Sequence, residues 1–502
     1  MPLFDLDLLV GAAVALLAVF AARVSSRLGL PALLLFLLVG MMLGPLGFGI
    51  QFSDAGMAHG LGFAALVLIL AEGGLSTKWS SIKPALGVAG LLATVGIGGS
   101  IALMAVFAHF ALHLPWTVAV LLGAVTAPTD SAAVFSVLRG VSIPTRLRSI
   151  LEAESGLNDA PTVLVVIAMT GLAAGHQPSG GIPGLIGSIV VELAGGILLG
   201  VEMGWIAVRI TRRVSLPSSG LYALAALAWA VLAYGVGVWV GVSGFASVYV
   251  ASVVIGNGRL PYRNATRSFA EGVGWMAQIG LFVMLGLLAD LDRLTWTEVL
   301  EGVVAGLFLT VIARPLSVAL CASWFKMPPR HQAFVSWAGL RGAVPIILAT
   351  IPLAARIPEA GKLFDIVLVF VVVFTCIQGP TLAAAGRLLG LVDPDAATDV
   401  DIEVAPLDEI DAVLLQVHVP VDSHLIGVTV RELRLPRNAF ISLIIRADES
   451  FVPHASTALM RADELLLVTP EAERRQVEER LTEIGRGGRL ARWNGLRVKA
   501  EE

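Results

Sequence analysis

The sequence predicts an all-α polytopic membrane protein with about thirteen transmembrane helices, followed by a small cytoplasmic α+β domain. Three observations predict this class. Apolar residues make up 56% of the 502 residues and charged residues 14%, whereas about a quarter of a soluble protein is charged. Apolar runs of spanning length recur up to residue 388, and the mean hydropathy is +0.84. After Gly390, short apolar runs alternate with charged stretches.

The net charge, the cysteines and the first residues also argue against several other classes of protein. The net charge of -4 is small, so nothing indicates nucleic acid as a partner. The two cysteines, Cys321 and Cys376, lie in apolar runs and lack the spacing of a disulfide framework or a zinc site. The first residues, MPLFDLD, are acidic where a signal peptide is basic. The first apolar run is therefore expected to be a membrane helix.

Thirteen apolar segments are expected to cross the membrane. Their approximate ranges are 5–22, 30–48, 60–77, 85–110, 115–138, 150–174, 184–209, 217–239, 242–257, 269–289, 298–323, 331–354 and 363–388. Loops after odd-numbered segments, with the end of the last segment, hold 16 basic residues, whereas the other loops hold only Arg293, Arg356 and Lys362. The positive-inside rule therefore places the N-terminus outside and the C-terminus in the cytoplasm.

An internal symmetry fits this count. The first six and the last six segments would be inverted repeats that flank the seventh, which makes the fifth and twelfth segments equivalent. Both contain a proline and small or polar residues near their middles. Paired interrupted helices in two halves are typical of a transporter binding site.

The region after residue 390 divides into three parts. Residues 391–410 are rich in acidic residues and contain no basic one, which predicts a solvated linker. Residues 411–485 are expected to form the α+β domain, and residues 486–502 a tail. Within the domain, the patterns predict strands at 412–420, 439–447 and 462–470 and helices at 427–435 and 471–485.

The fifth segment contains the stretch TAPTDSAAV. Pro128 removes a backbone donor and restricts Ala127 before it, so the helix is expected to break there. Irregular backbone at membrane depth is tolerated only where it lines protein or a cavity. Because Thr126, Thr129 and Asp130 surround the break, we interpret it as part of a binding site rather than as a plain kink.

The sixth segment opens with LEAESGLNDAP. Ser155 and Asp159 are four residues apart, as are Glu154 and Asn158, so these side chains form one polar stripe along a helix. Glu152 is close to a basic loop and fits a solvated helix start. Asp159 lies about two turns further in, where an ionisable side chain is expected to be functional.

The twelfth segment contains WAGLRGAVPIILA. Arg341 lies within it between Gly339 and Gly342, and Pro345 follows one turn later. A buried arginine needs an acidic partner, and Glu154 is the expected one. The alternative is that Arg341 extends its side chain to the interface.

The chemistry of these stretches predicts a site for a dehydrated alkali cation. Two carboxylates, hydroxyl groups and free carbonyl groups are hard oxygen ligands. Burial also disfavours charge on a carboxyl group, so the same group can hold either a proton or a cation. If the two compete and only loaded forms reorient, the result is cation–proton exchange.

The motifs TAPTD, ESGLND and GLRGAVP, in this order and spacing, resemble those of the monovalent cation:proton antiporters, in the electroneutral branch related to the NhaP and NHE exchangers. The resemblance covers residues 1–390. It implies a homodimer in the plasma (inner) membrane, with a dimerisation domain and a core domain that moves like an elevator. The fifth and twelfth segments would cross as broken helices in the core. A secondary transporter, not an enzyme, without a cofactor is implied.

The resemblance also implies roles for single residues. Asp159 would be the central ligand of the cation and the proton, and Asp130 its neighbour, helped by Thr129 and Ser155. Asn158 occupies the place of an aspartate in electrogenic relatives, which implies one cation per proton.

Three further residues match the family pattern. Glu154 and Arg341 would form a structural ion pair between the sixth and twelfth segments. Glu72, in LAEGGLSTKW, matches an acidic residue of the third segment; the alternative is an interface residue near Lys78.

Residues 425–473 resemble the C-terminal lobe of RCK modules, which regulate potassium channels and transporters. Antiporters with this lobe resemble the potassium/proton type that serves pH and cell-volume homeostasis, which favours K⁺ as the cation. A small regulatory ligand, a nucleotide or an ion, could bind the lobe; the alternative is a dimerising scaffold without a ligand.

Other functions remain open. A Na⁺(Li⁺)/H⁺ antiporter of the same fold would use the same ligands. An RCK-gated cation channel would usually need a filter of repeated carbonyl groups, and no TVGYG-like loop is present. An intramembrane aspartyl protease would need a GxGD motif and gives Arg341 no role. An organic solute carrier would need more polar anchors than one ion site.

Overall fold

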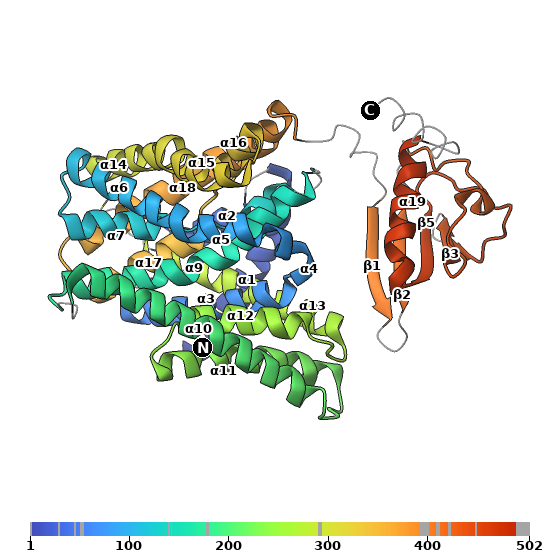
Figure 1. Cartoon of the computed structure of the whole chain (residues 1–502), viewed down its shortest axis with the longest axis horizontal. Helices are drawn as coiled ribbons and strands as arrows, with labels where there is room; N and C mark the ends of the chain where they lie inside the picture. The colour runs from blue at the N-terminus through green and yellow to red at the C-terminus, as the bar shows by residue number, and fades with distance from the viewer. Residues whose placement is uncertain are drawn as a thin grey trace. The chain divides into compact units, whose positions relative to one another are not determined.

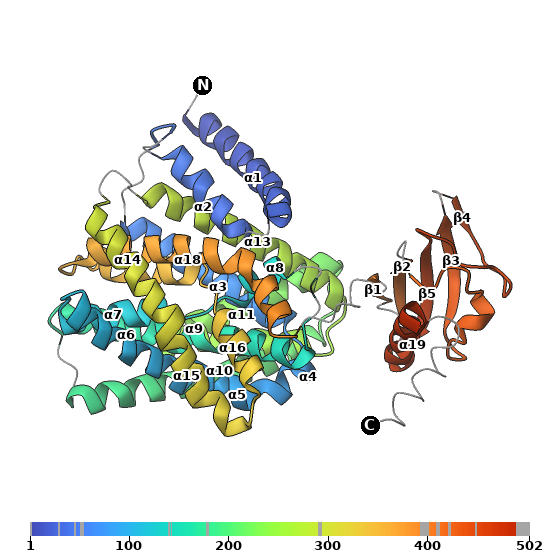
Figure 2. The same cartoon turned by 90° about the horizontal axis from the view of Figure 1, so that it is seen from above.

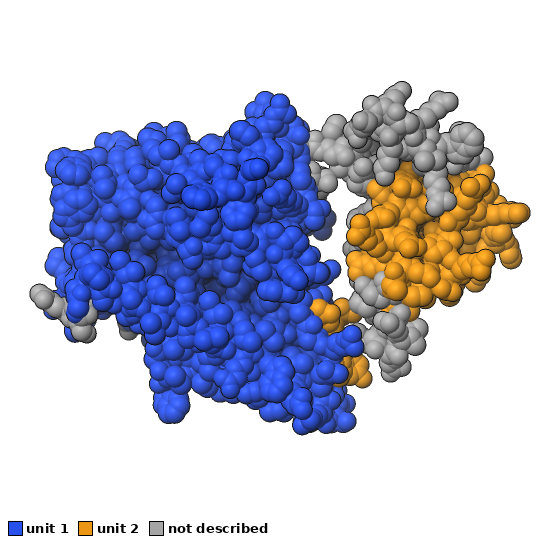
Figure 3. Space-filling view, in the orientation of Figure 1, with its two compact units in different colours: residues 1–139, 143–260, 265–392 blue, residues 140–142, 261–264, 393–502 orange. Residues whose placement is uncertain are grey.

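The computed structural model describes residues 3–28, 31–44, 47–50, 55–138, 141, 143–176, 180–289, 294–391, 401–407, 412–419, 423–446 and 449–487. The chain forms two compact units (Figure 3). Unit 1 comprises residues 1–139, 143–260 and 265–392, and unit 2 comprises residues 140–142, 261–264 and 393–502. The two units are considered separately below.

Unit 1 is built of helices (Figures 1 and 2). Their bounds are α1 Leu3–Leu28, α2 Ala32–Leu43, α3 Ala55–Ser76, α4 Trp79–Ile82, α5 Leu86–Leu91, α6 Ile97–Ala111, α7 Trp116–Thr126, α8 Ser131–Val137, α9 Thr145–Ala173, α10 Gly181–Thr211, α11 Ser219–Val240, α12 Gly244–Asn257, α13 Arg263–Leu288, α14 Trp296–Phe308, α15 Arg314–Ala322, α16 Pro329–Trp337, α17 Ala343–Ala354 and α18 Ala360–Leu388. Short 3₁₀ turns, η1 (Lys83–Ala85) and η5 (Ser323–Phe325), and two π-helical turns extend some of them.

Each of the thirteen predicted segments falls on a helix or a chain of helices. Among the described residues, eight helices are long and apolar enough to cross a membrane, and α7 with α8 makes a ninth if that bent pair is one span. Four further apolar helices are shorter, including α2, α12 and α17. The mostly helical membrane fold is therefore confirmed, whereas thirteen crossings stay a prediction.

The predicted break in the fifth segment is present. Helix α7 ends at Thr126, α8 begins at Ser131, and the two helices are bent by 45°. Pro128 lies in the gap and cannot donate a backbone hydrogen bond. Asp130 caps the new helix, because its Oδ1 accepts a hydrogen bond of 3.1 Å from the backbone N–H of Ala133.

The predicted break in the twelfth segment is present too, and the two breaks touch. Helix α16 ends at Trp337 and α17 begins at Ala343. The backbone N–H of Asp130 donates a hydrogen bond of 2.8 Å to the carbonyl group of Leu340. The crossing of two broken helices is thus confirmed, and a backbone hydrogen bond joins the two breaks.

Two groups of closely packed helices can be distinguished within unit 1. Helix α12 packs against α3, α10 and α11, and these four are called the first helix group. Helix α9 packs against α5, α7 and α17, and both α7 and α17 also contact α18; these five are called the second helix group. The two groups meet where α17 lies against α3 and where α9 passes α10 and α12.

Two π-helical turns lie in segments that the predicted repeat makes equivalent. The turn η2 (Leu92–Gly96) interrupts the fourth segment, and η4 (Leu309–Ala313) interrupts the eleventh. Turn η2 packs against α15, and η4 packs against α6. Such turns are rare and occur mostly at functional sites, so their reciprocal placement is consistent with the predicted inverted repeat.

Unit 2 contains a five-stranded antiparallel sheet in the order β1-β2-β5-β3-β4. The strands are β1 Asp401–Leu407, β2 Ala412–His418, β3 Phe440–Arg446, β4 Glu449–Phe451 and β5 Glu464–Pro470. A short turn, η8 (Glu471–Glu473), leads into helix α19 (Arg474–Gly487), whose Val477, Leu481 and Ile484 join the core formed by the sheet. The three predicted strands and the helix after them are confirmed.

Two expectations for this region are wrong in part. Residues 401–407 of the predicted linker form β1, which pairs with β2 along its whole length. Ile402 and Val404 give the alternating pattern of a strand, and Pro406 is compatible with an edge strand. The helix expected at 427–435 is only a 3₁₀ turn, η7 (Val430–Leu433). Most of the predicted tail lies outside the described residues.

Candidate functional site

A cavity of about 530 Å³ in unit 1 collects most of the candidate residues. Helices of the first group and α13 line part of it, with the polar side chains of Glu72, Ser76, Tyr249 and Gln278. The first helix break, α8, α9 and α17 also line it, with the polar side chains of Thr129, Asp130, Ser155 and Asp159. Lys78 and Arg148, which are exposed, also line the cavity, so it reaches the surface of the unit.

The four predicted cation ligands thus line one cavity. Asp159 is buried, with 7% of its surface exposed, and its Oδ1 has no hydrogen-bond partner. Asp130 lines the cavity from the end of the first helix break, directly before α8. Ser155 fixes the break from α9, because its Oγ accepts a hydrogen bond of 3.1 Å from the backbone N–H of Ser131. An unpaired buried carboxylate oxygen is costly, which fits a site that binds a cation or a proton.

Hydroxyl and carbonyl oxygens would complete the coordination of a cation here. In the part of the chain that the structure describes, no group of three or more His, Cys, Asp or Glu side chains could hold one metal ion. A cation at Asp130 and Asp159 would therefore take further ligands from groups such as Ser155 and Thr129. Carboxylate and hydroxyl groups are hard oxygen donors, which suit an alkali cation.

Asn158 lies beside this site and holds the helix break in place. Its side chain is fully buried, and its Nδ2 donates a hydrogen bond of 2.9 Å to Thr129 Oγ1. Asn158 is not among the cavity-lining residues. The geometry therefore assigns it to positioning Thr129, next to but not inside the cavity.

Gly342 is the point at which the twelfth segment approaches Asp130. A Cβ atom at this position would lie 1.9 Å from Asp130 Oδ2 and 2.9 Å from Asp130 Cγ. No side chain fits there unless Asp130 moves. The second glycine of the GLRGAVP stretch, Gly342, is thus required by the contact between the two helix breaks.

Glu72 lies on α3 and lines the same cavity as the two aspartates. The hydroxyl group of Ser76 donates a hydrogen bond of 3.0 Å to Glu72 Oε1. Its side chain packs against α13, where Gly274 leaves room for it: a Cβ atom there would lie 2.8 Å from Glu72 Cγ. Glu72 therefore lines the cavity and is held by Ser76 and by its packing against α13.

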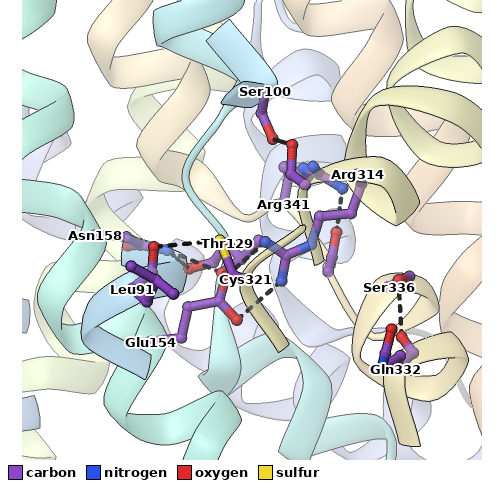
Figure 4. A network of polar contacts seen from close by, with 12 residues as sticks. Leu91, Ser100, Thr129, Glu154, Asn158, Arg314, Cys321, Gln332, Ser336 and Arg341 are labelled. Carbon is purple, nitrogen blue, oxygen red and sulfur yellow. Dashed lines mark hydrogen bonds and ion pairs between the residues drawn. The ribbon is translucent and has the colours of Figure 1, made fainter. Parts of the chain in front are cut away.

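The predicted ion pair between Glu154 and Arg341 is wrong. Glu154 pairs with Arg314 instead: Arg314 Nη1 lies 2.6 Å from Glu154 Oε1, and Nη2 lies 2.9 Å from Oε2 (Figure 4). Both side chains are almost fully buried, with 2% and 1% of their surfaces exposed. Both carboxylate oxygens are thus engaged by one planar guanidinium group, a geometry that arginine favours.

Arg341 is buried as predicted, but carbonyl groups are its partners. Its Nε donates to the carbonyl oxygen of Thr126 at 3.3 Å, and its Nη1 donates to that of Gly339. Both carbonyl groups belong to the ends of the broken helices, where backbone acceptors lack helical partners. Among the described contacts, Arg341 Nη2 has no hydrogen-bond partner.

Arg314 is the site residue that the sequence analysis missed. A signal was available, because Arg314 lies inside an apolar segment directly before Pro315, much as Arg341 lies one turn before Pro345. The π-helical turn η4 ends directly before Arg314. Buried arginines in both segments were candidates for Glu154, and only the packing of the helices distinguishes them.

Comparison with protein families gives two matches. The sequence model described as "Sodium/hydrogen exchanger, transmembrane" matches residues 12–387. The model described as "TrkA-C domain" matches residues 414–482. The first match covers the helical unit, and the second covers strands β2 to β5 with most of α19.

Two curated relatives resemble most of the chain. The K⁺/H⁺ antiporter NhaP2 of Shewanella sp. (strain ANA-3) is 34% identical over 472 residues, covering 92% of this chain and 81% of the relative. The Na⁺/H⁺ antiporter NhaS2 of Synechocystis sp. is 26% identical over 396 residues, covering 76% of this chain and 70% of the relative.

A solved structure shares the fold. The sodium proton antiporter MjNhaP1 of Methanocaldococcus jannaschii superposes with a TM-score of 0.66 at 22% identity. The match covers 76% of this chain and the whole of that one. The helical fold of unit 1 is therefore one that a solved membrane protein adopts.

Proposed function

The chain belongs to the sodium/hydrogen exchanger family and carries a TrkA-C domain, and we propose that it exchanges a monovalent cation, preferably K⁺, for protons. One observation carries this proposal. Asp130 and Asp159 face the same cavity, and Asp159 keeps an unpartnered buried oxygen there. Such a pair of carboxyl groups can bind a cation when ionised or hold a proton in its place.

In the proposed mechanism the cation and the proton compete for Asp159 and Asp130. Either load reduces the negative charge of the site, so that only a loaded site can reorient between the two sides of the membrane. Thr129 and Ser155 add oxygen ligands for the cation. Asn158 carries no charge, so we infer that one proton exchanges for one cation and that transport is electroneutral.

The preference for K⁺ rests on the relatives. The NhaP2 relative, which is similar over 92% of this chain, is named a K⁺/H⁺ antiporter. The alternative of the same class is Na⁺ or Li⁺ exchange, which the family description and the NhaS2 relative favour. The ligands themselves are hard oxygens that accept either cation.

The domain assignment follows from this function. We assign residues 1–390 to exchange across the plasma (inner) membrane, with the N-terminus outside. The cytoplasmic TrkA-C domain would regulate exchange, either by binding a small ligand or by dimerising. Since β1 belongs to the sheet of unit 2, we place the start of this domain at residue 401 rather than 411. A homodimer is part of the same proposal.

The test uses purified protein in liposomes with an imposed inside-acid pH gradient. K⁺, Na⁺ or Li⁺ is added outside, and the internal pH and the membrane potential are followed with dyes. We expect K⁺ to dissipate the gradient in the wild type without a change in potential. Asp159→Asn should abolish this response, because a neutral amide neither binds a proton nor offers a charged ligand.

Glu202→Gln provides a matched control. It removes a carboxylate from α10, where Glu202 is exposed and does not line the cavity, and it should leave exchange intact. A response to Na⁺ alone would select the sodium alternative. Movement of K⁺ that changes the potential without moving protons would instead indicate an RCK-gated cation channel and would overturn the proposal.

A further inference from the structure

Tyr249 and Gly156 form a tight contact between the two helix groups. Tyr249 lies on α12 in the first group, and Gly156 lies on α9 in the second. A Cβ atom at Gly156 would lie 2.1 Å from Tyr249 Oη, 2.4 Å from Cζ and 2.8 Å from Cε2. The end of the tyrosine ring therefore rests on the bare backbone of α9, and only glycine permits this approach.

The contact lies inside the cavity, between its surface end and the aspartates. Tyr249 and Gly156 both line the cavity. Along α9, Gly156 is one turn after Glu152, which lines the cavity with the exposed Lys78 and Arg148, and three residues before Asp159. Since residues three and four apart share a helix face, the ring covers the face of α9 that leads from Glu152 to Asp159.

Tyr249 is buried and packed within the first helix group. Only 6% of its surface is exposed. Its helix packs closely against α3, where a Cβ atom at Gly74 would lie 2.7 Å from the carbonyl oxygen of Tyr249. The backbone of Tyr249 is thus fixed to the first helix group, whereas the ring reaches over to the second.

We propose that Tyr249 is a positioning residue that gates Asp159. Its ring rests on Gly156 and covers the route from the surface end of the cavity to Asp159. The same contact sets how the second helix group packs on the first. This inference rests on the proposed exchange function. Any movement of α9 past α12 must slide Gly156 under the ring or separate the two. The flat glycine surface permits that movement, and a side chain at position 156 would obstruct it.

The first test measures access and does not require transport. In a background with Cys321→Ala and Cys376→Ala, Ser155→Cys is labelled in membrane vesicles with an impermeant thiol reagent. Labelling of Lys78→Cys, at the surface end of the cavity, shows whether that end faces the outside or the inside of the vesicles. Adding Tyr249→Ala should raise the labelling rate of Ser155→Cys roughly tenfold, since the ring no longer covers it, whereas Tyr249→Phe should leave the rate nearly unchanged.

The second test is a suppressor experiment on exchange. Gly156→Ala should lower the exchange rate about tenfold or more, since the added methyl group overlaps the ring. Combining it with Tyr249→Ala should restore the rate to within about threefold of Tyr249→Ala alone, because coupled neighbours are not additive. Gly171→Ala, on the same helix with nothing within 4 Å of the added Cβ, should exchange like the wild type.

The two tests separate the gate from the exchange function. If Tyr249→Ala leaves the labelling rate of Ser155→Cys unchanged, the gate is overturned whether or not the protein exchanges cations. A double variant as slow as Gly156→Ala, with melting behaviour like the wild type, would overturn the docking role. If labelling rises as expected while the wild type moves no cation, the gate stands and the proposed exchange function fails.

Discussion

The pair of Glu154 and Arg314 is a buried charge pair with almost no contact with water. Its two hydrogen bonds, of 2.6 and 2.9 Å, join α9 to α15. Replacing such a pair by apolar residues can be neutral, but removing one partner leaves an uncompensated charge. The pair is therefore a sensitive point of the fold next to the helix breaks.

We predict that Arg314→Ala destabilises the purified protein by about 3–5 kcal/mol, the usual cost of breaking a buried pair. Adding Glu154→Gln should reverse at least half of the decrease in melting temperature, because it removes the charge of the unpaired Glu154 carboxylate. Thermal unfolding of the two single variants and the double variant measures this coupling.

Arg341→Ala is the control, since its partners are carbonyl groups. Glu154→Gln should not rescue it. Rescue of Arg341→Ala, with none for Arg314→Ala, would mean that the pairing of Glu154 is the one expected from the sequence.

Asn158 gives a second prediction at this scale. Its Nδ2 donates a hydrogen bond to Thr129 Oγ1 at the helix break, and an ionised aspartate has no donor. Asn158→Asp should therefore lower exchange about tenfold or more, as expected when a buried hydrogen bond is replaced by two acceptors. Liposome exchange at saturating cation tests this.

The opposite result for Asn158→Asp is also informative. If that variant exchanged at the wild-type rate and generated a membrane potential, the residue would set the charge stoichiometry alone. Its contact with Thr129 would then be dispensable.

At the scale of elements, the crossing of the two helix breaks builds the site. Pro128 marks the first break, and Gly339, Gly342 and Pro345 mark the second. Both breaks were predicted from such residues, because proline and glycine act locally through the backbone. The partner of Glu154 could not be predicted in this way. Arg314 lies directly before Pro315 and Arg341 lies one turn before Pro345, so both are intramembrane arginines near a proline. The choice between them depends on how α15 and α16–α17 pack against α9.

In unit 2, too, a feature that depends on pairing between elements could not be predicted from local sequence. Strands β2, β3 and β5 were predicted from continuous apolar runs, whereas β1 has acidic residues between its apolar ones and resembles a linker. Its strand conformation depends on β2, with which it pairs from Asp401 opposite His418 to Leu407 opposite Ala412. The hydrophobic pattern of residues 401–407 taken alone does not show that these residues pair with β2, so the strand could not be predicted from it.

The crossing itself can be tested at Gly342. Gly342→Ala should raise the apparent KM for the cation about tenfold, because the methyl group displaces the carboxylate of Asp130 by overlap with Oδ2. Gly361→Ala, in α18 with nothing within 4 Å of the added Cβ, should leave KM unchanged. An unchanged KM for a folded Gly342→Ala variant would show that Asp130 does not hold the cation.

At the scale of the whole molecule, unit 1 should exchange cations without unit 2. The last helix of unit 1, α18, has its own termination: the N–H of Gly390 donates to the carbonyl group of Arg387 at 3.0 Å, and the N–H of Leu391 donates to that of Gly386 at 2.9 Å. Gly390 has a φ of 65°, as glycine allows at the end of a helix. A chain ending at Val392 therefore keeps this cap.

We predict that truncation after Val392 leaves the maximal exchange rate within about threefold of the wild type, because unit 1 is a compact unit of its own and keeps the cap of α18. The response of the full chain to a ligand of the TrkA-C domain would be lost. Truncation after Leu388 is the matched control, since it removes the cap as well and should lower the melting temperature. If the Val392 truncation folds like the full chain but exchanges nothing, unit 2 is part of the transport cycle itself, and the division between an exchanging unit and a regulating unit is wrong.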